Sequence, residues 1–136
     1  MKATKRSIIL LLFLILNVSC SSSKDDCLIC QEDPIRLSRK TIEFNAELNT
    51  TVLTTKGTNW KLIEISYNND IIDLSGIDTQ STSFKIENSN FIFERKTAKD
   101  IFIEMSPNYT GNIKKLIVVL QDGDYFGQIT VLQSTD

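Results

Sequence analysis

The stretch 114-KKLIVVLQDGDYFGQITVLQ-133 decides the fold, because it holds two strongly apolar runs on either side of a tight-turn sequence. The first run, residues 114–121, is apolar on both faces, which is typical of a strand in the middle of a sheet. Asp122-Gly123 separates it from the second run, residues 125–133, and this dipeptide between two strands indicates a hairpin. We expect four side chains of this pair to be buried: Ile117, Val119, Ile129 and Val131.

Similar short runs, apolar or alternating, recur along the chain and are broken by turn residues. The nine runs cover residues 40–44, 50–56, 60–67, 71–75, 82–87, 90–95, 100–106, 114–121 and 125–133. This spacing, with no helical periodicity after Pro34, is typical of an antiparallel β-sandwich. We therefore expect an all-β domain of about seven to nine strands over residues 35–134, with no helix longer than two turns. A body of about 100 residues rich in Ile, Leu, Val and Phe can bury a core without disulfides.

The N-terminus has the pattern of a signal peptide. A basic start, MKATKRS, precedes the uninterrupted apolar run from Ile8 to Leu16. This run is too short to span a bilayer as a helix, which needs about 20 residues. The sequence Val18-Ser19-Cys20 that follows resembles the lipobox of bacterial lipoproteins, although Asn17 stands where an aliphatic residue is usual. We expect residues 1–19 to be the signal peptide; the alternative is an ordinary secretory peptide cleaved near Ser19.

The lipobox resemblance implies that Cys20 is the lipidation site and the first residue of the mature protein. Two or three acyl chains anchor a protein stably, whereas one binds only marginally. Residues 20–34 then form a lipidated polar tether. Within it, Lys24, Asp25 and Asp26 resemble the acidic export signals of surface lipoproteins of Bacteroidota. We expect an outer-membrane protein displayed at the cell surface; the alternatives are a periplasm-facing anchor, and a plain polar linker in place of an export signal.

The other two cysteines, Cys27 and Cys30, both lie in the tether. A redox CxxC motif sits at a helix N-terminus after a strand, and no strand precedes this one. Tetrahedral zinc needs four ligands, and the chain supplies two cysteines and no histidine. The pair therefore predicts a local disulfide in an oxidising compartment, with two free thiols or a metal or redox role as the alternatives.

Several short motifs of the body occur in an order found in one known family. They are Trp60 after Asn59 at a strand start, Asn108 in a loop with Thr110 and Gly111, Lys114 or Lys115 after that loop, and Thr130, Val131 and Gln133 in the last strand. This order resembles the BACON domain (Bacteroidetes-associated carbohydrate-binding often N-terminal) over about residues 35–134. The family usually has Arg where this chain has Lys, and the middle, residues 68–90, is longer here. The resemblance implies an immunoglobulin-like (Ig-like) fold and carbohydrate binding, although in some enzymes such domains look like spacers.

Five side chains are candidates for contacting a ligand: Tyr109, Asn108, Tyr67, Tyr125 and Trp60. Aromatic rings offer flat apolar faces with a polar edge, as sugar recognition requires. The tyrosines fall at strand ends or in loops, where they reach solvent. A lone Trp at a strand start is more often a core residue, so we expect Trp60 to be buried. Asn108 is more often a loop residue that bonds its own backbone.

The composition argues against several function classes. The formal net charge is −2, and removal of Lys2, Lys5 and Arg6 with the signal peptide makes it −5. An acidic chain without a basic stripe does not attract nucleic acid. The chain has no histidine, and its carboxylates show no paired spacing, so we expect neither an enzyme nor a metal or other cofactor.

The sequence therefore predicts a non-catalytic lipoprotein, held on the membrane by its lipid anchor. Its domain binds a ligand whose identity the sequence does not give, with a glycan or another surface protein as the candidate partners. The alternative is a structural subunit or spacer of a cell-surface assembly with no small ligand.

Overall fold

A computed structural model describes residues 31–136. The signal peptide, Cys20, the candidate export signal at Lys24, Asp25 and Asp26, and the pair Cys27 and Cys30 all lie outside the described residues. Those predictions therefore stay predictions. No helix in the described part of the chain is long and apolar enough to cross a membrane.

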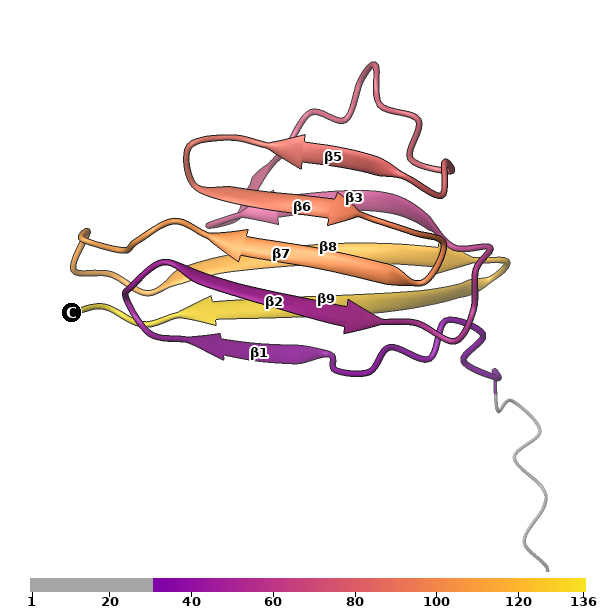
Figure 1. The fold of residues 1–136 in the computed structure, drawn as a ribbon, viewed down its shortest axis with the longest axis horizontal. Coiled ribbons are helices and arrows are strands. Elements are labelled where there is room, and N and C mark those ends of the chain that lie inside the picture. Colours follow the sequence, from indigo (N-terminus) through magenta and orange to yellow (C-terminus); the bar gives the residue numbers. More distant parts are fainter. Residues whose placement is uncertain (1–30) are drawn as a thin grey trace, which may run out of the picture. The chain divides into compact units, whose positions relative to one another are not determined.

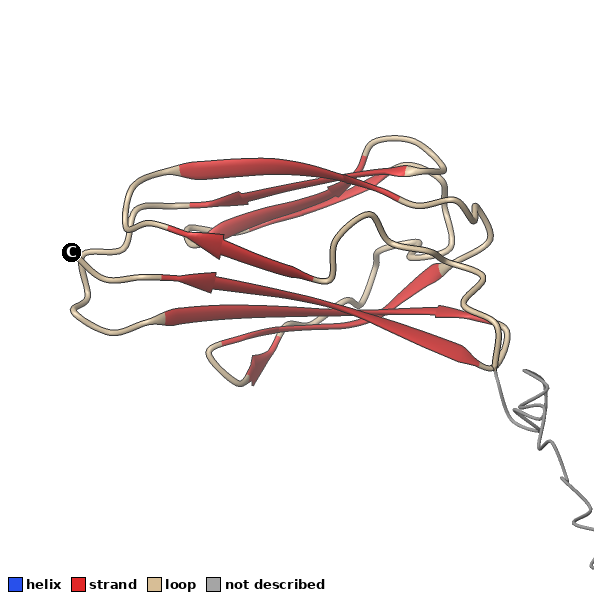
Figure 2. Cartoon of the chain, turned by 90° about the horizontal axis from the view of Figure 1, so that it is seen from below, coloured by secondary structure: helices blue, strands red, loops and turns tan. Residues whose placement is uncertain are grey.

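Nine strands form two sheets that lie face to face (Figures 1 and 2). They are β1 (Thr41–Phe44), β2 (Asn49–Thr54), β3 (Lys61–Tyr67), β4 (Asp70–Ile71), β5 (Phe84–Glu87), β6 (Phe91–Arg95), β7 (Asp100–Met105), β8 (Lys114–Asp122) and β9 (Tyr125–Gln133). The five-stranded sheet has the order β1-β9-β8-β3-β4, and the four-stranded sheet has the order β2-β7-β6-β5. Every pairing is antiparallel except that of β1 with β9.

The strand order is that of an Ig-like sandwich. In such domains the second, fifth and fourth strands of the fold (B, E and D) face the third, sixth and seventh (C, F and G). Here β2-β7-β6 faces β3-β8-β9, and β5 is an additional strand beside β6. The prediction of an all-β, Ig-like sandwich of seven to nine strands is confirmed.

The core lies between the sheets and is built by strict alternation along the strands. The side chains with almost no exposed surface include Ile35, Leu53, Trp60, Ile65, Phe91, Phe93, Ile101, Ile103, Met105, Leu116, Val118, Leu120, Ile129 and Val131. The predicted burial of Trp60, Ile129 and Val131 is confirmed. The prediction for Ile117 and Val119 is wrong: both are half-exposed on the outer side of β8, while Leu116, Val118 and Leu120 face the core.

The run at residues 71–75 is the other prediction that fails. Only Ile71 of it is in a strand, as the second residue of β4. Asp73 then accepts hydrogen bonds at Oδ1 from the Ser75 backbone N–H (2.9 Å) and from the Ser75 hydroxyl (2.7 Å). Gly76 follows with φ of 81°. This local turn chemistry outweighs the β-branched residues of the run.

Two tight turns fix the register of the five-stranded sheet. Asn68 and Asn69 join β3 to β4 with φ of 49° and 72°, the positive pair that a type I′ turn requires. Gly123 and Asp124 join β8 to β9, and only Gly123 has a positive φ (58°), as in a type II′ turn. The predicted hairpin is confirmed, with Asp122 as the last residue of β8.

Candidate functional site

Loops gather at the two ends of the sandwich, and the described chain begins at one end and finishes at the other (Figure 1). We call the end where Gln31 lies the entry end; it also carries the β2–β3 and β6–β7 connections and the β8–β9 turn. We call the opposite end the far end. It carries the β1–β2, β3–β4, β5–β6 and β7–β8 connections and the C-terminal residues.

Asn108 stabilises the long β7–β8 loop at the far end through hydrogen bonds. It is fully buried, and its Nδ2 donates to the carbonyls of Asn112 (2.8 Å) and Ser134 (2.9 Å). Its Oδ1 accepts from the Thr110 hydroxyl (2.7 Å) and the Thr110 backbone N–H (3.2 Å). Its backbone N–H donates to the Ala46 carbonyl (2.7 Å), which ties the loop to the β1–β2 connection. Since these bonds occupy its side chain, Asn108 offers no group to a ligand.

Tyr109 is the next residue, and its side chain points to solvent. Its side chain is 76% exposed, the largest exposure among the large hydrophobic residues that reach the surface. The loop that carries it is held by the bonds of Asn108 and by a bond from Gln133 Nε2 to the Ser106 carbonyl (3.0 Å). An aromatic ring on a backbone fixed in this way is preorganised for binding, because ordering it costs little.

The other two tyrosines are less available and lie far from Tyr109 or beneath the surface. Tyr67, at the end of β3, is half-buried, and its ring centroid lies 5.8 Å from that of Phe91 in the core. Tyr125 is half-buried at the entry end, where its hydroxyl accepts from Lys40 Nζ (3.3 Å). The five candidates therefore do not form one site, and Tyr109 alone among them presents a whole ring to solvent.

Trp60 is buried at the entry end as part of a polar cluster. Its Nε1 donates to the Thr55 hydroxyl (3.1 Å), and the Arg95 guanidinium lies 3.5 Å from its ring centroid. Its exposure is 1%, so it offers no stacking face to a ligand. Trp60, like Asn108, therefore leaves the set of candidate ligand contacts.

Arg95 is the central residue of this cluster, and sequence reasoning missed it. It is fully buried at the end of β6, and no carboxylate within residues 31–136 forms an ion pair with it. Nη1 donates to the carbonyls of Trp60 (2.8 Å) and Ser81 (3.1 Å), and Nη2 to those of Thr58 (2.7 Å) and Ala98 (3.0 Å). Burial lowers the pKa of Arg95 below its ordinary value. The residue joins three connections of the entry end, so its role is structural.

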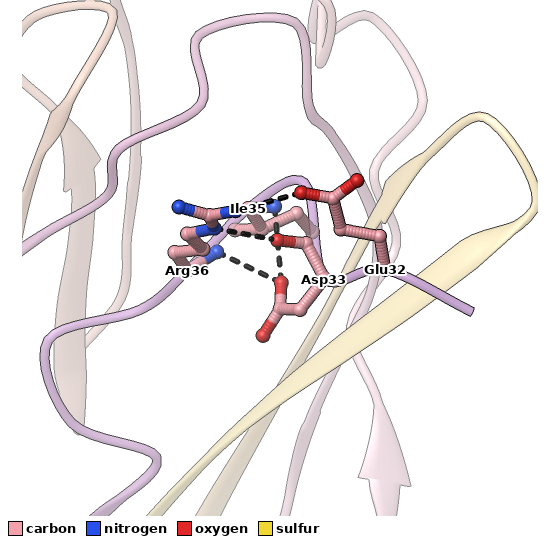
Figure 3. Close-up of polar contacts among 4 residues, drawn as sticks. All are labelled: Glu32, Asp33, Ile35 and Arg36. Carbon is pink, nitrogen blue, oxygen red and sulfur yellow. Dashed lines mark hydrogen bonds and ion pairs between the residues drawn. The ribbon is translucent and has the colours of Figure 1, made fainter. Parts of the chain in front are cut away.

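The start of the described chain is held against the entry end by a compact turn (Figure 3). Asp33 Oδ1 accepts from the backbone N–H of Ile35 (3.0 Å) and of Arg36 (2.8 Å), and Arg36 has a positive φ of 48°. Arg36 Nη2 donates to Glu32 Oε1 (2.7 Å). The Ile35 side chain is fully buried below, and its carbonyl accepts from the backbone N–H of Gly57 (3.2 Å).

Asp33 and Lys40 each stabilise the charged form of the other. The pKa of Asp33 lies below its ordinary 3.8: burial acts to raise it, and bonds from the Arg36 backbone, Tyr125 and Lys40 outweigh this. The bond to Tyr125 and the contact with Asp33 (3.4 Å) raise the pKa of Lys40. These contacts hold the first described residues against the entry end of the domain.

A groove of about 480 Å³ lies at the far end, on the outer side of the five-stranded sheet. It is lined by Glu43, Phe44, Asn45, Ile113, Leu132 and Ser134. Ile113 is 67% exposed there. Within residues 31–136 no three His, Cys, Asp or Glu side chains come together as a metal site would need.

Comparisons with known proteins identify the fold and no family. No family model and no curated protein matches the chain. A protein from Bacteroides thetaiotaomicron, solved by NMR, superposes with a TM-score of 0.60 at 12% identity, over 77% of this chain and 90% of that one. Titin M4 superposes with a TM-score of 0.45 at 9% identity, over 75% of this chain and 91% of that one. At 12% identity the first likeness shows the shared sandwich fold alone.

Proposed function

We propose that this protein is a non-catalytic, lipid-anchored outer-membrane lipoprotein, exposed at the cell surface, whose Ig-like domain recognises a ligand at its far end. The observation that carries the proposal is Tyr109. It is an exposed aromatic side chain on a loop braced from inside by Asn108. The β7–β8 loop that carries it lies at the end of the domain opposite Gln31, the first described residue (Figure 1).

A BACON-type domain is part of the proposal, and the structure supports it in a specific way. The residues that carry the resemblance are mostly structural: Trp60, Asn108 and Gln133 are buried, and Lys114 is nearly so. Gln133 Nε2 donates to the carbonyls of Glu47 and Ser106 (3.0 Å each), and Lys114 Nζ to that of Pro107 (3.5 Å). Asn108, Lys114 and Gln133 hold the far-end loops in place, and Trp60 belongs to the cluster at the entry end. The motif residues therefore carry information about the fold rather than about the ligand.

The anchor is tested by replacing Cys20. Cys20→Ala removes the thiol that accepts the lipid, so the protein should leave the membrane fraction and should no longer incorporate labelled palmitate. Ser21→Ala is the matched control and should stay anchored. A Cys20→Ala protein that remains membrane-bound and labelled would contradict the anchor.

The ligand is tested with a glycan array and a pull-down from native outer membranes. The expected result is a glycan or a protein partner that the wild type binds and Tyr109→Ala loses with its fold intact. Tyr125→Ala, at the entry end, is the matched control and should bind normally. Loss with Tyr125→Ala alone would move recognition to the entry end and contradict the proposal.

An array without any signal, together with a stable co-purifying protein that Tyr109→Ala still binds, would favour the alternative of an assembly subunit. That outcome would exclude the glycan, whereas a glycan lost in Tyr109→Ala would establish it.

A further inference from the structure

The outer surface of the five-stranded sheet, which we call the five-stranded face, carries several apolar side chains beside its polar ones. Ile117 and Val119 lie side by side with Thr130 and Gln128 of β9 in the register of the sheet. Leu132 and the exposed Phe126 continue the apolar surface along β9. A strand that is apolar on both sides, as β8 is, is expected where both sides are covered.

The outer surface of the other sheet is different. Lys85 forms an ion pair with Glu87 (2.5 Å) and lies opposite Glu94 in the register of β5 and β6. Lys96 lies 4.3 Å from the ring centroid of Phe102, which covers the apolar part of β7. These charged side chains suit contact with water.

On the five-stranded face, the exposed Phe126 side chain and the groove lie on either side of Thr130, at about equal distances along β9. Phe126, 58% exposed, lies four residues before Thr130 on β9. Ser134, which lines the 480 Å³ groove, lies four residues after it. A two-fold axis that lies above Thr130, parallel to the sheet and perpendicular to its strands, therefore places the Phe126 ring of each copy over the groove of the other.

The same axis also brings side chains of opposite charge together. On β8, Lys115 lies two residues before Ile117, and Val119 lies two residues after it. Glu64 of β3 pairs in register with Val119. Since Ile117 is opposite Thr130, the same axis brings Lys115 of one copy beside Glu64 of the other. Opposite charges would meet at two symmetric places.

The size of the face also fits. The five strands of the sheet hold 31 residues, and each residue covers about 16 Å² of a flat sheet. The flat area is therefore roughly 500 Å², and the side chains add to it. A stable protein interface buries about 800 Å² on each partner.

We infer that the five-stranded face binds a second copy of this chain, in a two-fold pair centred on Ile117 and Thr130 with the strands of the two copies antiparallel. Phe126 fills the partner's groove, and Lys115 pairs with the partner's Glu64. This inference goes beyond the proposed function and does not depend on the lipid anchor or on the ligand at Tyr109.

The test uses residues 31–136, which contain both sheets and all of the described core, and no cysteine. Sedimentation velocity over a range of concentrations should show a dimer. Phe126→Ala should weaken dimerisation about tenfold or more, because large aromatic side chains at the centre of a pocket dominate interface energies. Val52→Ala, on the exposed surface of the other sheet, is the matched control and should dimerise normally.

Charge reversal tests the geometry without disturbing the core. Lys115→Glu places like charges together and should weaken the dimer about tenfold, as should Glu64→Lys. The double variant Lys115→Glu with Glu64→Lys restores the pairs and should return to within about threefold of the wild type. Loss without restoration in the double variant would overturn the proposed arrangement.

Cross-linking locates the axis. Thr130→Cys places one thiol of each copy at the centre of the pair, where facing sheets are about 10 Å apart. A short bis-maleimide should join two Thr130→Cys chains and should leave Val52→Cys chains unjoined. A wild type that is monomeric up to about 1 mM, or a dimer joined through Val52→Cys and not through Thr130→Cys, would overturn the inference.

Discussion

Arg95 gives the sharpest prediction about stability. Arg95→Met keeps an unbranched stem beside Trp60 and removes the guanidinium with its four bonds to backbone carbonyls. A bond to a charged group contributes about 1.5–3 kcal/mol net, and an orphaned buried carbonyl costs about 1–3 kcal/mol. The bond to the Trp60 carbonyl is buried, whereas the bonds to the carbonyls of Thr58, Ser81 and Ala98 are only partly buried, so the loss of each of these three costs less. We expect Arg95→Met to lower the free energy of unfolding by about 4 kcal/mol.

This loss is large for a domain of ordinary stability, which is about 5–15 kcal/mol. The assay is urea unfolding followed by the fluorescence of Trp60, the single tryptophan, which the guanidinium contacts. Arg39→Met is the matched control: Arg39 is exposed and bonds only Thr51, so we expect a change within about 0.5 kcal/mol. An Arg95→Met domain within about 1 kcal/mol of the wild type would refute the assignment of Arg95 as the main polar support of the entry end.

Three further predictions follow from single contacts. Gly57→Ala should cost about 2–3 kcal/mol in chemical unfolding, because a Cβ there overlaps the Pro34 carbonyl oxygen. Asn108→Ala should cost about 2–3 kcal/mol by the same assay, and the exposed Asn112→Ala less than about 0.5 kcal/mol. Asp33→Asn should be less stable than wild type at neutral pH. Since the pKa of Asp33 is lowered on folding, that difference should persist above pH 3.8 and vanish as the pH falls through the lower folded value; a pH-independent difference would contradict it.

The strands were predictable from sequence because alternation and turn residues are local signals. The runs at β6, β7 and β9 and the turn at Gly123 all appear in the structure where the pattern places them. The run at residues 71–75 failed because the hydrogen bonds of Asp73 to Ser75 depend on turn geometry that composition does not encode.

The burial of β8 failed for a different reason. Alternation identifies a buried face only when the two faces differ, and β8 is apolar on both. The pairing with β9 shows which face of β8 is buried: Val118 pairs with Ile129 on the core side, and Ile117 pairs with Thr130 on the outer side. The same ambiguity that misled the sequence analysis marks the five-stranded face as unusual.

The candidate site was only partly predictable. Asn108 and Tyr109 are neighbours in sequence, yet one is fully buried and the other is 76% exposed. Asn108 is buried because its partners come from Ala46 and Ser134, which are distant in sequence. Arg95 was missed because its partners are backbone carbonyls, which leave no pattern of side chains to read.

The central claim, that recognition takes place at the far end around Tyr109, is tested most directly by photo-cross-linking on living cells. A photoreactive phenylalanine analogue would replace Tyr109 in the full chain, and in a second strain the exposed Lys99 of the entry end. The account predicts a defined cross-linked product at position 109 with a molecule other than another copy of the chain, and none at position 99. A product at position 99 with none at position 109 would contradict it.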